Sequence, residues 1–211
     1  MDTQPVILNE WQTFPPKHPD KTSGVEHKVP ETDNPTLSEI SATTLNHKGF
    51  FWEAADLALK AYHLAPDNLR LLEQTVHYCE YAGKFHQAKA LLGTRYRLVQ
   101  GEAHPHDDLI NQVVNFMDEK LITDDDLEKL IKTVMSIPHK HHLYQFGEGS
   151  TEVYLLEDEY SKWYHYGVKL RHIEIDEVVE LCLELSDTLA EVDLPTVVTN
   201  NFVPSFHLAE E

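Results

Sequence analysis

The chain has 211 residues, of which 36 are acidic and 17 are basic, so its formal net charge is −19. A surface of that sign repels phosphates and anionic membranes, which makes direct nucleic-acid binding and membrane binding unlikely and suits a basic partner. The length predicts one domain with tails, and a content of 41% hydrophobic residues is enough to build a core.

Cysteine usage and the absence of targeting segments predict a cytoplasmic protein. Cys79 and Cys182 fall in apolar helical patterns and form no CxxC pair, so we expect two buried thiols in a reducing compartment. The first residues lack the basic and apolar regions of a secretory signal. No apolar run reaches the roughly 18 residues that a membrane span requires.

Residues 1–34 are polar and rich in proline, and we expect a flexible N-terminal arm. From Thr36 to Leu64 the sequence predicts two helices, the first capped by Thr36 or Ser38 and ended by Gly49. A second pair is predicted from Leu69 to about Val99.

The two predicted pairs repeat each other at a spacing of 34 residues. Gly49 recurs as Gly83, and in the same register Phe51 and Ala54 recur as Phe85 and Ala88. A period of 34 residues is typical of stacked pairs of antiparallel helices.

These residues resemble the tetratricopeptide repeat family, in which a Gly, an aromatic residue and an Ala open the second helix and a Pro closes it. The resemblance covers residues 35–101. Arg95 and Gln100 depart from the pattern, at the positions that match Ala61 and Pro66. Two plain helical hairpins are the alternative interpretation.

A degenerate third pair is predicted up to Pro138. Apolar spacing favours one helix from His106 to Phe116 and a second from Asp125 to Ile137, with Asp124 as N-cap and Pro138 as the stop. The predicted fold is therefore mainly α, a short helical-repeat solenoid of two to three antiparallel helix pairs over residues 35–138, followed by C-terminal capping helices.

The C-terminal region, residues 139–194, is expected to be helical or α+β. Apolar residues of the segment 151–173 recur at three and four, which favours a helix, whereas dense aromatic and β-branched residues favour a β-hairpin. A helix is predicted from Asp176 to Val192, and residues 195–211 are expected to form an extended tail.

We find no catalytic template in the sequence. The nucleophile elbow, the phosphate-binding loop, the dinucleotide fingerprint and the HExxH motif are all missing, so we expect no catalytic residue, no cofactor and no metal. The histidines that cluster in the sequence are expected to be solvated, namely His104, His106, His139, His141 and His142.

The leading hypothesis is a non-enzymatic scaffold, adaptor or chaperone that binds a basic or amphipathic protein segment. The resemblance implies a groove on the inner face of the first helices. That face lacks the cations with which some members of the family hold a C-terminal carboxylate. The candidate groove residues are Glu39, Thr43, Asn46, Gln74, His77, Tyr78, Tyr81, His106, Ile110 and Asn111.

Other interpretations stay open at this point. An acidic mimic of nucleic acid could inhibit a DNA- or RNA-binding protein, and an enzyme could carry an unrecognised site. A further set of residues forms either a homodimer or partner interface or a layer that closes the core, namely Tyr160, Trp163, Tyr164, Cys182, Leu185 and Leu189.

Overall fold

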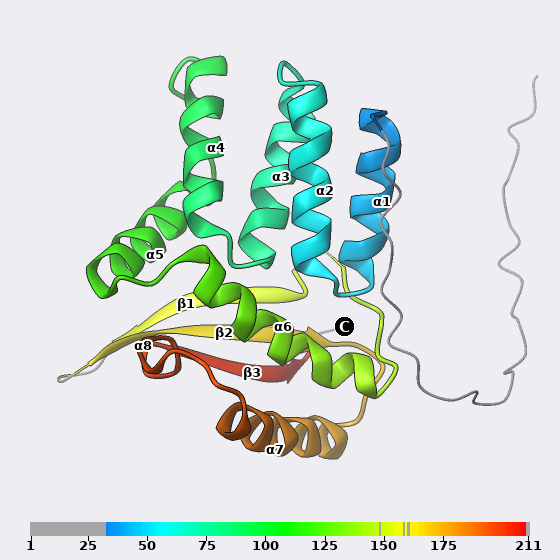
Figure 1. The fold of residues 1–211 in the computed structure, drawn as a ribbon, viewed down its shortest axis with the longest axis vertical. Coiled ribbons are helices and arrows are strands. Elements are labelled where there is room, and N and C mark those ends of the chain that lie inside the picture. Colours follow the sequence, from blue (N-terminus) through cyan, green and yellow to red (C-terminus); the bar gives the residue numbers. More distant parts are fainter. Residues whose placement is uncertain (1–32, 148, 158, 160, 210–211) are drawn as a thin grey trace, which may run out of the picture. The chain divides into compact units, whose positions relative to one another are not determined.

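A computed structural model describes residues 33–147, 149–157, 159 and 161–209. The predictions for the N-terminal arm and for Tyr160 lie outside these residues. In the described part, six helices precede a β-hairpin, and two further helices precede a last strand (Figure 1). Of the helices described, none has both the length and the apolar composition that crossing a bilayer requires.

The first four helices form two consecutive pairs, which stand side by side in Figure 1. They are α1 (Pro35–His47), α2 (Phe51–Leu64), α3 (Leu69–Tyr81) and α4 (Phe85–Leu98). This arrangement is compatible with the predicted helical repeat. The cap of α1 differs from the prediction, because the Asn34 side chain accepts a hydrogen bond from the amide of Thr36 at 2.9 Å. Pro35 then takes the first helical position, where a missing amide costs nothing.

The predicted third antiparallel pair is wrong. α5 (Asp107–Lys120) packs on α4, whereas α6 (Asp124–Lys140) turns away and runs beneath the first two pairs (Figure 1). Pro138 lies inside α6 and does not stop it, since in the last turn only one carbonyl loses its helical donor.

The 34-residue echo reflects contacts with α6. Gly49 and Gly83 both have positive φ, +78° and +72°, at the turns inside the two pairs. A Cβ on Gly49 would lie 2.6 Å from Met135 Cε, and one on Gly83 would collide with Ile131 Cδ1. Because Ile131 and Met135 are one helical turn apart, the repeated glycine lets each pair rest closely on α6.

The N-terminus of α6 depends on a capping box. The amide of Asp126 donates to Thr123 Oγ1 at 3.2 Å, and the amide of Thr123 donates to Asp126 Oδ2 at 2.9 Å. We expect Thr123→Ala to lower the free energy of unfolding by about 1 kcal/mol. Thr133→Ala, at an exposed position of the same helix, should stay within about 0.5 kcal/mol of the native protein. Urea denaturation of both variants measures the difference, and equal losses would contradict the capping role.

The segment 151–173 forms the β-hairpin, so the hairpin interpretation is confirmed and the helical one is wrong. β1 (Thr151–Glu157) pairs antiparallel with β2 (Lys162–Leu170). The expected extended tail instead forms α8 (Thr196–Thr199) and β3 (Phe202–Leu208), which pairs parallel with β2. A parallel partner needs a long crossover, and α7 (Ile175–Glu191) supplies it.

The inner face of the sheet is the main contact between the C-terminal region and the helices. The ring of Tyr164 lies 5.0 Å from that of Phe116 and 5.8 Å from that of Phe202. The hydroxyl of Tyr166 donates to the carbonyl of Tyr81 at 2.8 Å. The alternating side chains of β2 therefore explain why a three-and-four spacing of apolar residues forms a strand here.

Candidate functional site

A hollow of about 460 Å³ lies between the C-terminal end of α1 and α3. Five of the ten predicted groove residues line it together, namely Asn46, Gln74, His77, Tyr78 and Tyr81. Three residues that the sequence analysis did not select complete the lining, His47, Arg70 and Glu73. The spacing of Arg70, Glu73, Gln74 and His77 at three and four along α3 is the signal that could have found them.

A hydrogen-bond network fixes the wall of this hollow. Gln74 Nε2 donates to the hydroxyl of Tyr78 at 2.9 Å and lies 3.3 Å from Thr43 Oγ1. The hydroxyl of Tyr78 lies 3.1 Å from Thr43 Oγ1. The predicted residue Thr43 thus joins α1 to α3, and the side chains that face a ligand are held in place.

The carboxylates beside the hollow are already paired. Arg70 forms a two-pronged ion pair with Glu39, at 2.5 and 2.8 Å, and Arg95 Nε lies 3.0 Å from Glu73. The predicted groove residue Glu39 is therefore not a free anion. Arg95, which departs from the repeat pattern, also donates to the carbonyl of Glu102 at 2.8 Å. The attraction for a basic segment must come mainly from the charge of the whole chain.

Asn46 places an unpaired polar group at the wall of the hollow. Its side chain is 5% exposed, and Oδ1 has no hydrogen-bond partner among the described residues. A buried acceptor without a donor costs about 1–3 kcal/mol. A ligand that supplies an N–H group at this position would recover that free energy.

Histidines crowd the end of the hollow beyond His77. The rings of His77, His104 and His106 lie 4.9–5.5 Å apart, and His106 Nδ1 lies 2.6 Å from Glu80 Oε2. His77, Glu80 and His106 each offer a ligand atom within 4.8 Å of the others, so they could hold a divalent metal ion. The expectation that His104 and His106 are solvated is wrong, because His104 is 6% exposed and His106 is half-buried.

Burial lowers the pKa of His104 to about 4, and nearby His77, His106 and Arg95 lower it further. At neutral pH this imidazole is therefore uncharged. Its Nδ1 accepts a hydrogen bond from the amide of His106 at 3.2 Å, which holds the turn before α5.

Two predicted groove residues lie elsewhere. Ile110 is 0% exposed, because the apolar side of α5 packs inward on α4, so it cannot contact a partner. Asn111 is exposed, and its side-chain amide donates to the carbonyl of Asp107 at 2.8 Å. The groove is therefore shorter than predicted and ends near His106.

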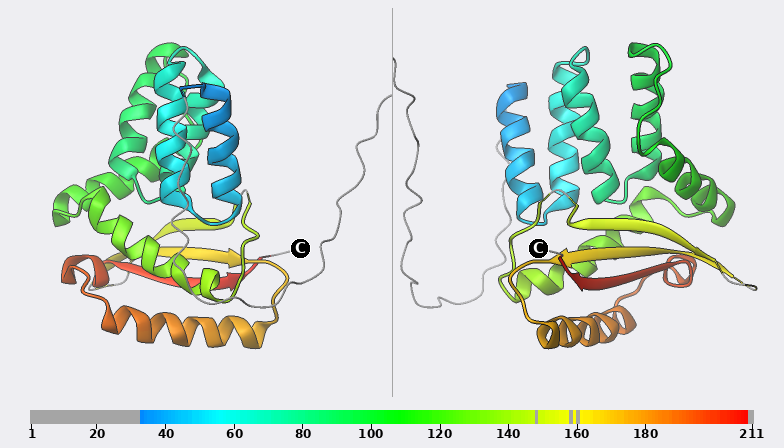
Figure 2. Two further views of the ribbon diagram at one scale, coloured as in Figure 1. Left: turned by 45° about the vertical axis from the view of Figure 1, so that its right-hand side comes forward. Right: turned by 180° about the vertical axis from the view of Figure 1, so that it is seen from behind.

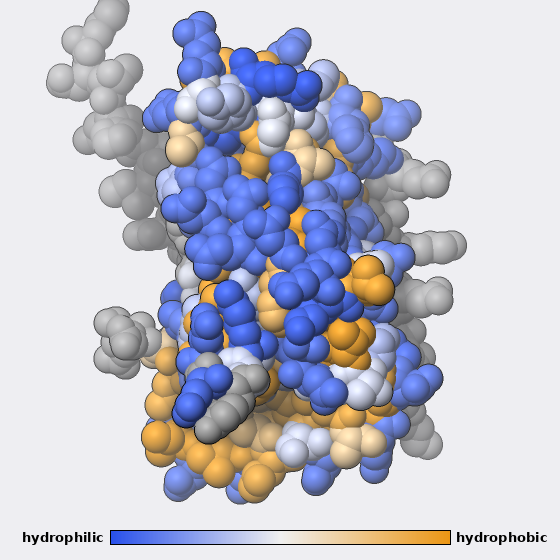
Figure 3. All heavy atoms as spheres, turned by 90° about the vertical axis from the view of Figure 1, so that its left-hand side faces the viewer, coloured by the Kyte–Doolittle hydropathy of each residue, from blue (hydrophilic) through white to orange (hydrophobic). Residues whose placement is uncertain are grey.

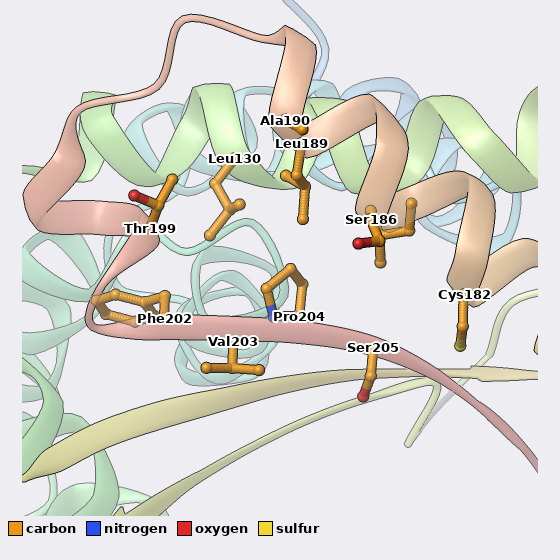
Figure 4. Close-up of a pocket in the computed structure, with 11 residues that line it drawn as sticks. Leu130, Cys182, Ser186, Leu189, Ala190, Thr199, Phe202, Val203, Pro204 and Ser205 are labelled. Atoms are coloured by element: carbon orange, nitrogen blue, oxygen red, sulfur yellow. The ribbon is translucent and has the colours of Figure 1, made fainter.

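The predicted interface residues divide between the core and a second hollow. Tyr164 is 0% exposed and Leu185 is 2% exposed, so neither forms an interface. Cys182, Leu185 and Leu189 line a mostly apolar hollow of about 370 Å³ between α7 and β3 (Figure 4). Trp163 is half-buried on β2. Figure 3 shows apolar residues gathered over the lower part of one face, below the hydrophilic helical part.

No family model, no curated protein and no solved structure matches this chain. The resemblance to the tetratricopeptide repeat thus remains a hypothesis that rests on the residues named above.

Proposed function

We propose that this protein is a non-enzymatic scaffold that binds an amphipathic protein segment in the hollow beside α3. The observation that carries the proposal is the convergence of five predicted groove residues from two helices on one hollow. Aromatic and amide side chains of this kind offer apolar contact together with hydrogen bonds to a peptide backbone. As a scaffold that binds proteins, it would act as an adaptor or chaperone in the cytoplasm.

The chemistry of the hollow favours a segment that is only mildly basic. Tyr78 and Tyr81 supply apolar surface, and Gln74 and Asn46 supply amide groups. Since Glu39 and Glu73 are already paired with arginines, close ion pairs contribute little. The net charge of −19 still attracts a basic segment at longer range, and that attraction is screened by salt.

A selection from a random peptide library tests this proposal. We expect selected peptides to lose at least about 10-fold in affinity, roughly 1.4 kcal/mol, for Gln74→Trp, because the indole fills the hollow. Gln87→Trp makes the same change on α4, outside the hollow, and should bind like the native protein. Fluorescence anisotropy measures the affinities, and circular dichroism checks that both variants are folded.

Two results would contradict the proposal. One is that the library yields no binder; the other is that Gln74→Trp and Gln87→Trp bind the selected peptides equally well. The contribution of charge has its own test, since affinity should fall as salt rises from about 50 mM to about 500 mM. An unchanged affinity would remove the electrostatic part and leave the location intact.

A further inference from the structure

The face of the sheet that points away from α7 gathers three metal-ligating side chains from three strands. Figure 4 shows Pro204 pointing toward α7, whereas Val203 and Ser205 point away from it. In Figure 2 (right) no helix of the described part stands in front of the sheet. We call this surface the open face, and it carries Glu152, Tyr154, His165, Gly167, Lys169, Val203, Ser205 and His207.

Strand register brings the ligand atoms together. Glu152 of β1 pairs with Gly167 of β2, two residues beyond His165, and His207 of β3 pairs with the next residue on that face, Lys169. Glu152, His165 and His207 each place one ligand atom within 4.8 Å of the other two. Residues on three hydrogen-bonded strands hold such a geometry more rigidly than residues on loops.

The two imidazoles stand at the separation that a tetrahedral ion requires. His165 Nε2 and His207 Nε2 are 3.3 Å apart. Two nitrogens bound to tetrahedral Zn²⁺ at about 2.0–2.1 Å lie about 3.4 Å from each other. The hydroxyl of Ser205, at 2.6 and 2.7 Å from the two nitrogens, makes the hydrogen bonds that an ion would replace.

A glycine makes room for this cluster. A Cβ on Gly167 would lie 2.8 Å from Glu152 Cγ, 3.0 Å from Glu152 Oε1 and 3.1 Å from His165 Cε1. The missing side chain therefore lets the carboxylate fold over the strand toward the imidazole. Lys169 Nζ pairs with the other oxygen, Glu152 Oε2, at 2.8 Å, so Oε1 is the oxygen that faces the cluster.

The protonation of the cluster suits a metal. Burial lowers the pKa of His165, and the neighbouring His207 lowers it further, whereas Glu152 raises it. The imidazole of His165 is therefore neutral at pH 7, the form that coordinates metals. The ring of Tyr154, 4.5 Å from that of His165, covers one side of it.

We propose that Glu152, His165 and His207 bind one divalent transition-metal ion, of the Zn²⁺ class, on the open face of the sheet. Two imidazoles and one carboxylate leave a fourth position free for water or for a group of another molecule. The site shares no residue with the hollow beside α3, so it stands or falls independently of the proposed peptide binding.

Titration of the metal-free full chain with Co²⁺ tests the site through its visible absorption, and competition with Zn²⁺ gives the affinity. We expect one ion per chain. His207→Gln and Glu152→Gln should each weaken binding at least about 10-fold, because loss of a ligand costs no less than loss of its supporting partner. Gly167→Ala removes no ligand but should also weaken binding, because it displaces Glu152.

The matched control addresses the other histidine cluster. The double variant His77→Gln/His106→Gln should bind the metal within about 3-fold of the native chain, less than 1.4 kcal/mol. The proposal is overturned if no ion binds, if His207→Gln binds as the native chain does, or if the double variant loses the ion. Circular dichroism of each variant distinguishes lost ligation from lost folding.

Discussion

Replacing Gly83 by alanine is expected to lower the free energy of unfolding by about 3 kcal/mol. A positive φ costs an L residue roughly 1–2 kcal/mol, and the forced approach of a Cβ to Ile131 adds about 1–3 kcal/mol. The φ of +72° and the position of Ile131 Cδ1 define both contributions. Urea denaturation measures the change, and Gly49→Ala should behave alike, because its Cβ would meet Met135 and Phe146.

Two further variants make this prediction specific to the contact with α6. Gly93 lies inside α4, and a Cβ there would meet nothing within 4 Å, so Gly93→Ala should stabilise the protein by about 0.5–1 kcal/mol. Ile131→Val, which removes Cδ1, should recover part of the loss in the Gly83→Ala background. A harmless Gly83→Ala would mean that the glycine echo has no structural role.

Acidification from pH 7 to pH 5 is expected to remove about 2 kcal/mol of stability through His104 alone. The pKa of this histidine is about 4 in the folded chain, against about 6.5 in an unfolded one. The unfolded state therefore takes up more protons as the pH falls, and stability is lost between these values. The measurement is the free energy of unfolding at both pH values for the native protein and for His104→Gln, which should lose about 2 kcal/mol less.

His86 provides a control of the opposite sign. Burial lowers its pKa, but hydrogen bonds to Asp118 and Asp124 outweigh this effect and raise it above the ordinary value. Its contribution is present at low pH and is lost as the pH rises through the folded pKa. His86→Gln should therefore make the loss on acidification larger, and a smaller loss in this variant would contradict the assignment.

Local sequence signals predicted the first four helices well, because apolar spacing, glycine turns and a following proline act over a few residues. They did not explain the echo, since Gly49 and Gly83 repeat to accommodate α6, which lies some fifty residues further along the chain. The third pair failed for the same reason. The apolar face of α6 packs beneath the first two pairs and is not used by α5.

Long-range pairing limited the rest. β3 is a strand because it lies parallel to β2 across a helical crossover, which no local pattern announces. The ten groove candidates included five that share a hollow, because helical spacing along α3 already places Gln74, His77, Tyr78 and Tyr81 on neighbouring faces. The ligands Glu152, His165 and His207 are far apart in sequence, so only the strand register reveals them.

The location of peptide binding is the central claim, and amide chemical shifts test it most directly. A peptide selected against the native protein is added stepwise to the isotope-labelled chain. We expect the largest shift changes at Asn46, Gln74, His77, Tyr78 and Tyr81, with small changes in α7 and β3. Changes confined to α7, β3 and the open face, with α3 unaffected, would contradict the account.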